Sequence, residues 1–229
     1  MLRLFFILLY IYPVFANTPS PEDQIRIIEN FISPNVSKKI QQFYIKTQKN
    51  LSSSTDNQLS LVNISNPATQ KMIQQISDQV LDLLSQIHPQ KNFYLDHAGL
   101  YGRIVGNFCP YHSDNCYFSC PIHGEDQSFL RAHCKGKCPG SLFKPNHTYW
   151  REYTALIYLN DDFEGGEILF EDGPCNKLYK KIIPIQAQML ILAPNGSNFY
   201  HEVFPIRKGT RYSIHLWYTS DPKHRLNPI

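Results

Sequence analysis

The stretch Tyr111-His112-Ser113-Asp114-Asn115 carries two metal-binding side chains one residue apart, and it decides how the rest of the chain must fold. In a strand, residues two apart project from the same face, so His112 and Asp114 can reach one metal ion together. A matching histidine, His201, occurs far along the chain. Strands so distant in sequence meet when a sheet rolls up on itself, and this requirement indicates a barrel.

The chemistry of these three side chains indicates iron. Two imidazoles and one carboxylate on one side of an ion, with open positions opposite, form the facial triad of non-haem Fe(II) sites. The predicted metal ligands are therefore His112, Asp114 and His201. A competing pattern, His123-Gly124-Glu125, has the longer carboxylate and lies in a cysteine-rich loop.

A candidate anion anchor follows the third ligand. Arg211 comes ten residues after His201, with Arg207-Lys208-Gly209 as a plausible turn between them. A hairpin there would carry Arg211 along the neighbouring strand, close to the metal. A guanidinium group binds a carboxylate through two parallel hydrogen bonds, and Ser213 adds a hydroxyl on the same strand face. A metal with a carboxylate anchor nearby is what 2-oxoglutarate needs.

Other chemistry-bearing positions near these motifs are interpreted as structural. The paired carboxylates of Glu164-Gly165-Gly166-Glu167 flank two glycines that allow a tight loop. Trp217, on the strand that follows Arg211, is expected to lie in the core. For His215 the core is favoured, with a position next to the metal ligands or the anchor as the alternative.

Four stretches together resemble the iron- and 2-oxoglutarate-dependent hydroxylases of prolyl and lysyl residues, in particular the catalytic domain of the collagen prolyl 3-hydroxylases. They are His112-Ser113-Asp114-Asn115-Cys116, residues 153–167 (YTALIYLNDDFEGGE), Arg207-Lys208-Gly209-Thr210-Arg211 and residues 216–222 (LWYTSDP). Prolyl 4-hydroxylases usually have lysine where Arg211 stands. The resemblance covers residues 25–224 in layout and is specific from residue 99 onward.

The resemblance implies hydroxylation of an unactivated C–H bond. Fe(II) would be held by His112, Asp114 and His201, and the far carboxylate of 2-oxoglutarate by Arg211 and Ser213. O2 would be the second co-substrate and ascorbate the reductant. The expected substrate is a proline in a peptide or protein, with a collagen-like chain as one form and peptidyl lysine as the alternative. A non-catalytic secreted jelly-roll binding module is the alternative from another class, since one scaffold hosts many functions.

Composition excludes some partners and points to a compartment. The net charge of +3 over 229 residues is too weak to indicate nucleic-acid binding. Residues 1–16 are typical of a secretory signal peptide, with an uncleaved anchor as the alternative. This apolar run is shorter than the roughly 20 residues of a membrane span, and no later stretch could form one.

Two further features agree with the secretory pathway, either the lumen of the endoplasmic reticulum or the exterior. Asn-x-Ser/Thr sequons predict a glycoprotein, and they occur at Asn35, Asn50, Asn63, Asn146 and Asn195. The chain also contains six cysteines, which in an oxidising compartment indicate disulfide bonds.

The order of patterns predicts an α+β, mainly β fold. Residues 17–92 are expected to form a helical support segment, with helices opening at Ser33-Pro34 and Asn66-Pro67. Residues 93–229 are expected to form a double-stranded β-helix, or jelly-roll barrel, braced by these two helices. Its strand-like runs are 98–106, 111–117, 151–159, 166–171, 179–185, 188–193, 199–206 and 210–219.

A cysteine-rich insert, residues 116–150, interrupts the strand pattern. Two Cys-x3-Cys pairs could staple two helical turns together, with Cys116 or Cys120 each bonding Cys134 or Cys138, while Cys109 and Cys175 form the remaining pair. A second metal site, for example zinc, is the alternative interpretation. Because long loops beside a metal motif tend to be functional, we expect the insert to frame the substrate groove.

Overall fold

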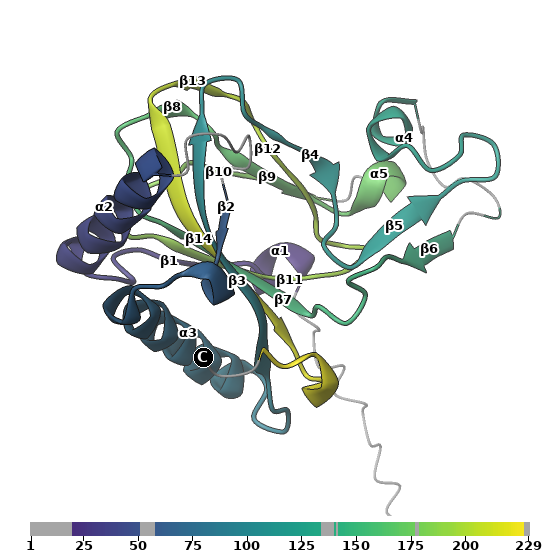
Figure 1. Ribbon diagram of the computed structural model, residues 1–229. Coiled ribbons are helices and arrows are strands. Elements are labelled where there is room, and N and C mark those ends of the chain that lie inside the picture. Colours follow the sequence, from purple (N-terminus) through teal and green to yellow (C-terminus); the bar gives the residue numbers. More distant parts are fainter. Residues whose placement is uncertain (1–19, 51–57, 134–139, 141, 177–178, 227–229) are drawn as a thin grey trace, which may run out of the picture.

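Two antiparallel sheets face each other in the computed structural model, which describes residues 20–50, 58–133, 140, 142–176 and 179–226 (Figure 1). The larger sheet has the strand order β1-β11-β7-β14-β3-β2, and the smaller sheet has the order β10-β9-β12-β4. These strands are β1 Arg26–Ile28, β2 Gln58–Ser60, β3 Tyr94–Ile104, β4 Cys109–His112, β7 Tyr153–Tyr158, β9 Ile168–Glu171, β10 Lys180–Ile183, β11 Leu190–Pro194, β12 Tyr200–Val203 and β14 Thr210–Thr219. The predicted mainly β jelly-roll fold is confirmed.

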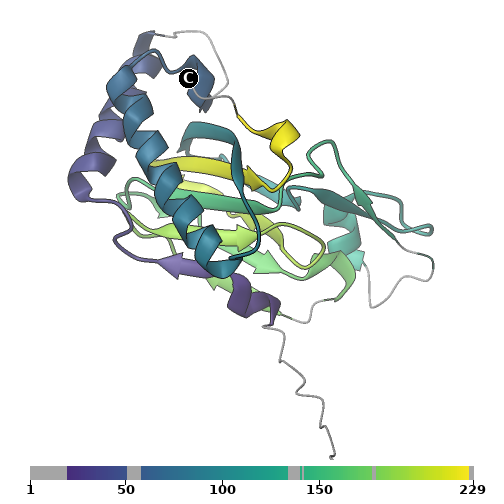
Figure 2. The same ribbon diagram turned by 90° about the horizontal axis from the view of Figure 1, so that it is seen from below.

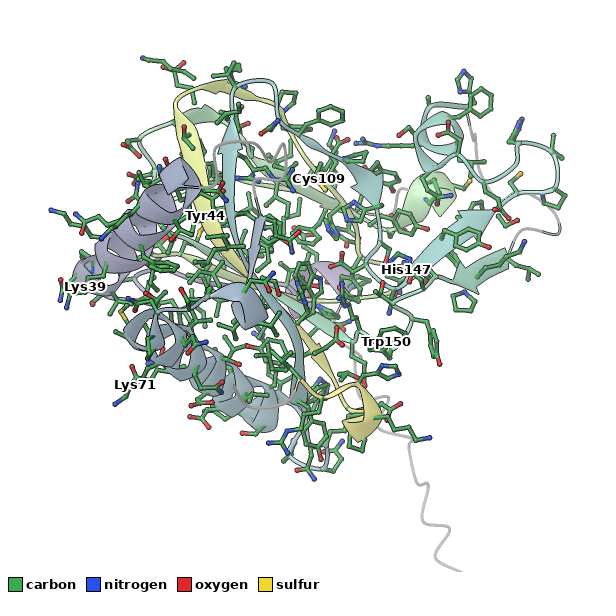
Figure 3. All side chains as sticks on the ribbon, viewed as in Figure 1. Lys39, Tyr44, Lys71, Cys109, His147 and Trp150 are labelled. Atoms are coloured by element: carbon green, nitrogen blue, oxygen red, sulfur yellow. The ribbon has the colours of Figure 1, made fainter. Side chains whose placement is uncertain are left out.

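Two long helices, α2 (Pro34–Asn50) and α3 (Pro67–Ile87), cover the outer face of the larger sheet (Figures 1 and 2). Both begin at the predicted prolines, and the Asn66 side chain caps α3 by accepting a hydrogen bond from the Thr69 amide at 2.9 Å. Their apolar stripes pack on the sheet, while Lys39 and Lys71 point away from it (Figure 3). Short helices missed by the sequence patterns are α1 Pro21–Gln24, η1 Leu61–Asn63 and η2 Pro222–His224.

Strand β14 divides its side chains between two environments. Ile214 and Leu216 are fully buried in the core beneath the helices. Because side chains alternate along a strand, Arg211 and Ser213 face the space between the two sheets. The interior of the barrel is therefore lined by polar side chains at one end and by the second apolar core, which includes Leu156 and Phe170, elsewhere.

The described part of the cysteine-rich insert packs behind the smaller sheet. It contains the hairpin of β5 (Cys116–Ser119) and β6 (Leu142–Pro145) and the helix α4 (Gln127–His133), which lies beside α5 (Gly173–Asn176). Arg131 of α4 forms ion pairs with Glu171 at 2.5 Å and Glu202 at 2.7 Å, and its guanidinium lies 4.6 Å from the centre of the Tyr111 ring. The insert is thus tied to β9, β12 and β4, the strands around the predicted metal ligands.

Two predictions about local structure were wrong. The predicted strand 111–117 is interrupted, because β4 ends at His112 and Asp114 lies in a bend before β5. The predicted hairpin from His201 to Arg211 does not form. Instead, β13 (Ile206–Lys208) pairs with β8 (Glu164–Gly165), and Gly209, with a φ of 76°, redirects the chain into the larger sheet. Arg211 therefore approaches the metal ligands from the opposite sheet.

The predicted cysteine pairing also needs correction. Cys109 and Cys116 carry free thiols, whereas Cys175 is disulfide-bonded. Cys109 and Cys175 cannot pair, because Cys109 packs in the core between the sheets and Cys175 packs in the cluster behind the smaller sheet. Cys116 lies on a strand and not on the expected helical turn. Cys134 and Cys138 lie outside the described residues, as does the predicted signal peptide, residues 1–16.

The helices of the described residues include none that is both long and apolar enough to cross a membrane.

Close packing of α2 on β3 gives a prediction about stability. A Cβ atom on Gly102 would lie 2.6 Å from Cε1 and 2.8 Å from the hydroxyl of Tyr44, which extends from α2 toward the sheet (Figure 3). We expect Gly102→Ala to lower the free energy of unfolding by about 1–3 kcal/mol in urea titrations. Ile104→Ala, at a 53% exposed position of the same strand, should change it by less than about 0.5 kcal/mol. Equal effects of the two substitutions would contradict this packing argument.

Candidate metal centre

The three predicted metal ligands converge at one end of the smaller sheet. His112 is the last residue of β4 and lies opposite His201 of β12, with ring centroids 4.4 Å apart. The bend after β4 brings Asp114 back, so that Oδ1 lies 3.5 Å from Nε2 of His112. One ligand atom from each of the three residues lies within 4.8 Å of the others. Among the described residues, this is the group of histidine, cysteine and acidic side chains that could hold a metal ion.

Both imidazoles are oriented by the backbone. Nδ1 of His112 lies 2.6 Å from the carbonyl oxygen of Pro110, and Nδ1 of His201 lies 3.2 Å from that of Phe199. Donation of the Nδ1 proton to these carbonyls leaves the lone pair of each Nε2 available to a metal. In both histidines, therefore, the carbonyl group two residues earlier in the chain fixes the orientation of the ring.

The carboxylate of Asp114 is held by two donors from the larger sheet. Oδ2 accepts a hydrogen bond from the Thr154 hydroxyl at 2.5 Å and from the indole N–H of Trp217 at 3.1 Å. These bonds direct Oδ1 toward the histidines. Trp217 is thus a hydrogen-bond donor to a predicted metal ligand and not only the core residue expected from the sequence. Thr154 was not singled out, because no sequence pattern marks a donor to a carboxylate 40 positions away.

Asp114 and His201 have the protonation states that metal binding requires, whereas His112 must lose a proton. Burial opposes protonation of His112, but its hydrogen bonds with Asp114 and Cys109 raise its pKa well above the ordinary value. Burial opposes ionisation of Asp114, but the hydrogen bond with His112 and the proximity of His201 hold the pKa of this carboxyl well below its usual range. Burial, reinforced by His112, lowers the pKa of His201 to about 4. At neutral pH, Asp114 is therefore ionised and His201 is neutral, as coordination requires. Two imidazole nitrogens and one carboxylate oxygen on one side fit Fe(II).

The predicted anion anchor lies on β14, in the larger sheet. Arg211 is only 3% exposed and donates a hydrogen bond from Nη1 to the carbonyl oxygen of Gly166 at 3.1 Å. Its Nε is buried without a hydrogen-bond partner, and no carboxylate within the described part of the chain lies within 4.0 Å of the guanidinium. Ser213 is fully buried next to it, and Tyr158 lies opposite Ser213 on β7. A buried, partly unpaired guanidinium beside a hydroxyl is prepared for an anionic ligand.

His215 lies beside the proposed anchor, which is the alternative to the core position favoured from the sequence. Its ring stacks on Tyr101 with centroids 4.1 Å apart, and its Nε2 lies 3.0 Å from the Ser213 hydroxyl. Burial, followed by the charges of Arg211 and Arg103, lowers the pKa of His215 well below its ordinary value. His215 is therefore neutral, so it adds hydrogen-bonding capacity to the cavity without adding charge.

Comparison with known proteins identifies relatives of this chain. A family model described as the 2OG-Fe(II) oxygenase superfamily matches residues 100–219. Prolyl 3-hydroxylase 2 from Homo sapiens is 34% identical over 116 residues, which cover 51% of this chain and 14% of that protein. Prolyl 3-hydroxylase 3 from Homo sapiens is 32% identical over 116 residues, again 51% of this chain and 14% of that protein. The matched segment is thus about one seventh of the length of these relatives.

Solved structures share the fold. The collagen prolyl hydroxylase vCPH of Paramecium Bursaria Chlorella virus-1, in complex with 2OG, aligns with a TM-score of 0.59 at 17% identity, covering 86% of this chain and 97% of that one. A prolyl hydroxylase from Trichoplax adhaerens, in complex with a hypoxia inducible factor peptide fragment, aligns with a TM-score of 0.59 at 18% identity, covering 88% of this chain and 86% of that one.

The two donors on Asp114 give a prediction about metal affinity. Trp217→Phe keeps a large ring but removes the N–H, so Asp114 loses one of its two donors from the larger sheet. We expect the affinity for Fe(II), measured anaerobically by titration, to fall about tenfold, as for other groups that orient metal ligands. The matched control is Trp150→Phe, because the Trp150 indole donates to Asp96 at 3.0 Å and not to a metal ligand. A similar loss in both variants would show that the indole of Trp217 has no specific role.

Proposed function

Because this chain belongs to the 2OG-Fe(II) oxygenase superfamily, we propose that it hydroxylates proline residues in a peptide or protein of the secretory pathway. Membership makes the chain a 2-oxoglutarate-dependent dioxygenase, with Fe(II) as cofactor and 2-oxoglutarate and O2 as co-substrates. The observation that carries the proposal is a three-ligand metal cluster and a buried, partly unpaired arginine that approach the interior of one barrel from its two sheets.

The metal ligands and the pair of Arg211 and Ser213 have separate roles in this proposal. His112, Asp114 and His201 hold Fe(II), which when bound supplies the activation of O2 for C–H hydroxylation. Arg211 and Ser213 bind the far carboxylate of 2-oxoglutarate and so orient the molecule along the cavity. No residue beyond the metal ligands is assigned to the chemical step. The buried walls exclude water, which strengthens the ion pair between Arg211 and the carboxylate.

The names of the similar proteins favour peptidyl proline as the substrate. The curated relatives are named prolyl 3-hydroxylases, and one of the structurally similar prolyl hydroxylases is described with a peptide fragment bound. A collagen-like chain is the specific form of substrate that we propose, and ascorbate is the proposed reductant. Arg211 occupies the position at which arginine is also typical of lysyl hydroxylases, so peptidyl lysine is the alternative substrate.

Three features support the proposed compartment and a glycosylated chain. Residues 1–16 have the pattern of a signal peptide, and Cys175 is disulfide-bonded. Among the sequons, Asn35 and Asn63 are exposed and can carry glycans. Asn195 cannot carry one in this fold, because its amide nitrogen is buried.

Succinate release tests the proposed activity directly. Purified protein with Fe(II), 2-oxoglutarate and ascorbate should release succinate, and collagen-like or other proline-rich peptides should stimulate this release. Mass spectrometry of the peptide should then locate one added oxygen on proline. Stimulation by lysine-containing peptides alone would favour the lysyl alternative, and no turnover by folded, iron-loaded protein would favour a non-catalytic binding module.

The anchor assignment gives a prediction about the co-substrate. Arg211→Met leaves a buried carboxylate without its cation, so the KM for 2-oxoglutarate should rise by about two orders of magnitude. The matched control is Arg207→Met, because Arg207 is exposed and pairs with Glu167 at 3.4 Å on the surface. If Arg211→Met behaves like Arg207→Met in succinate-release assays, Arg211 is not the anchor.

A further inference from the structure

We propose that Arg103 supplies a second cation to the far carboxylate of 2-oxoglutarate and so makes the cavity selective for dicarboxylates. This inference rests on the proposed function of the cavity. Arg103 lies on β3, outside every motif that the sequence patterns singled out, and it is partly buried.

The pairing of β3 with β14 places the two arginines side by side. Arg103 is the direct cross-strand partner of Arg211, so both side chains leave the sheet on the face that is turned toward the smaller sheet. Cβ atoms of such pairs are roughly 4.5–5.5 Å apart, and like charges placed there destabilise a sheet. The charge of Arg103 contributes, after burial, to the lowered pKa of Arg211.

No acidic side chain of the described residues compensates this pair. Neither Arg103 nor Arg211 has a carboxylate within 4.0 Å among residues 20–50, 58–133, 140, 142–176 and 179–226. Other partly buried arginines of this chain do have one, for example Arg131 with Glu171 and Arg151 with Asp96. An uncompensated cation pair on one wall of a cavity is therefore prepared for an anion that the protein itself does not supply.

Two stacked aromatic rings connect Arg103 with the proposed anchor. The guanidinium of Arg103 lies 5.5 Å from the centre of the Tyr101 ring, and Tyr101 in turn stacks on His215. His215 contacts the hydroxyl of Ser213, the other proposed ligand of the carboxylate. The stack thus places Arg103 on the same wall as the anchor. A carboxylate has two oxygens with several lone pairs, so it can accept hydrogen bonds from two guanidinium groups at once.

Binding measurements on Mn(II)-loaded protein separate this role from a structural one. The probes are 2-oxoglutarate and 2-oxopentanoate, which has the same chain length but lacks the far carboxylate. We expect Arg103→Met to raise the Kd of 2-oxoglutarate about tenfold, the loss of one charged hydrogen bond. The Kd of 2-oxopentanoate should stay within about twofold, and Arg103→Lys should recover part of the loss because it keeps the charge.

Arg225→Met is the matched control. Its guanidinium also lies 5.5 Å from the centre of a tyrosine ring of β3, that of Tyr94, but at the other end of the strand from Arg103. It should leave both Kd values within about twofold. An equal loss of 2-oxoglutarate affinity in Arg103→Met and Arg225→Met would overturn the proposal, since stacking on the strand would then explain the effect.

Thermal unfolding provides a second test, because Arg103→Met should affect the unfolding temperature in opposite directions without and with 2-oxoglutarate. Without ligand, Arg103→Met should unfold at the same temperature as the unaltered protein or higher, because it removes a repulsion. With 2-oxoglutarate, its gain in unfolding temperature should be smaller than that of the unaltered protein. A lower unfolding temperature without ligand and an unchanged gain with ligand would overturn the proposal. Loss of the 2-oxoglutarate effect in Arg103→Met but not in Arg211→Met would instead contradict the anchor itself, and so the proposed function.

Discussion

The metal site depends on a largely buried negative charge, the carboxylate of Asp114, whose side chain is 11% exposed. A carboxylate removed from water is costly unless hydrogen bonds and nearby cations compensate it. The larger sheet supplies two donors through Thr154 and Trp217, and the smaller sheet supplies His112 and His201. Asp114 therefore joins the two sheets at the end of the barrel where the metal ligands meet.

A second polar contact between the sheets, formed by Arg211, carries the opposite charge. Arg211 extends from the larger sheet and donates to the backbone of Gly166, which lies between β8 and β9 on the other side. Between these two polar contacts the sheets meet through apolar side chains such as Leu156 and Phe170. The alternation of β14 makes this possible, since one face completes the helix-covered core while the other presents Arg211, Ser213, His215 and Trp217 to the cavity.

The features that could be predicted from the sequence are those that depend on local patterns, and the incorrect predictions concern long-range pairing. The ligand residues and the two helices follow local patterns, namely His-x-Asp and proline after a capping residue. The hairpin from His201 to Arg211 was wrong, because the pairing of β13 with β8 is a long-range choice that spacing does not encode. The roles of Thr154 and Trp217 depend on which strands become neighbours. The disulfide prediction failed because the face of a sheet on which Cys109 lies cannot be read from cysteine spacing.

Strand β14 also acts as a ruler. Arg211 and Trp217 stand six positions apart on one face of it, and a strand rises about 3.3 Å per residue, so their backbones are separated by about 20 Å. Arg211 donates to Gly166 and Trp217 donates to Asp114, so both polar contacts between the sheets start from fixed positions of this one strand. A slip of β14 by one residue would turn both side chains away from the interior of the barrel at once.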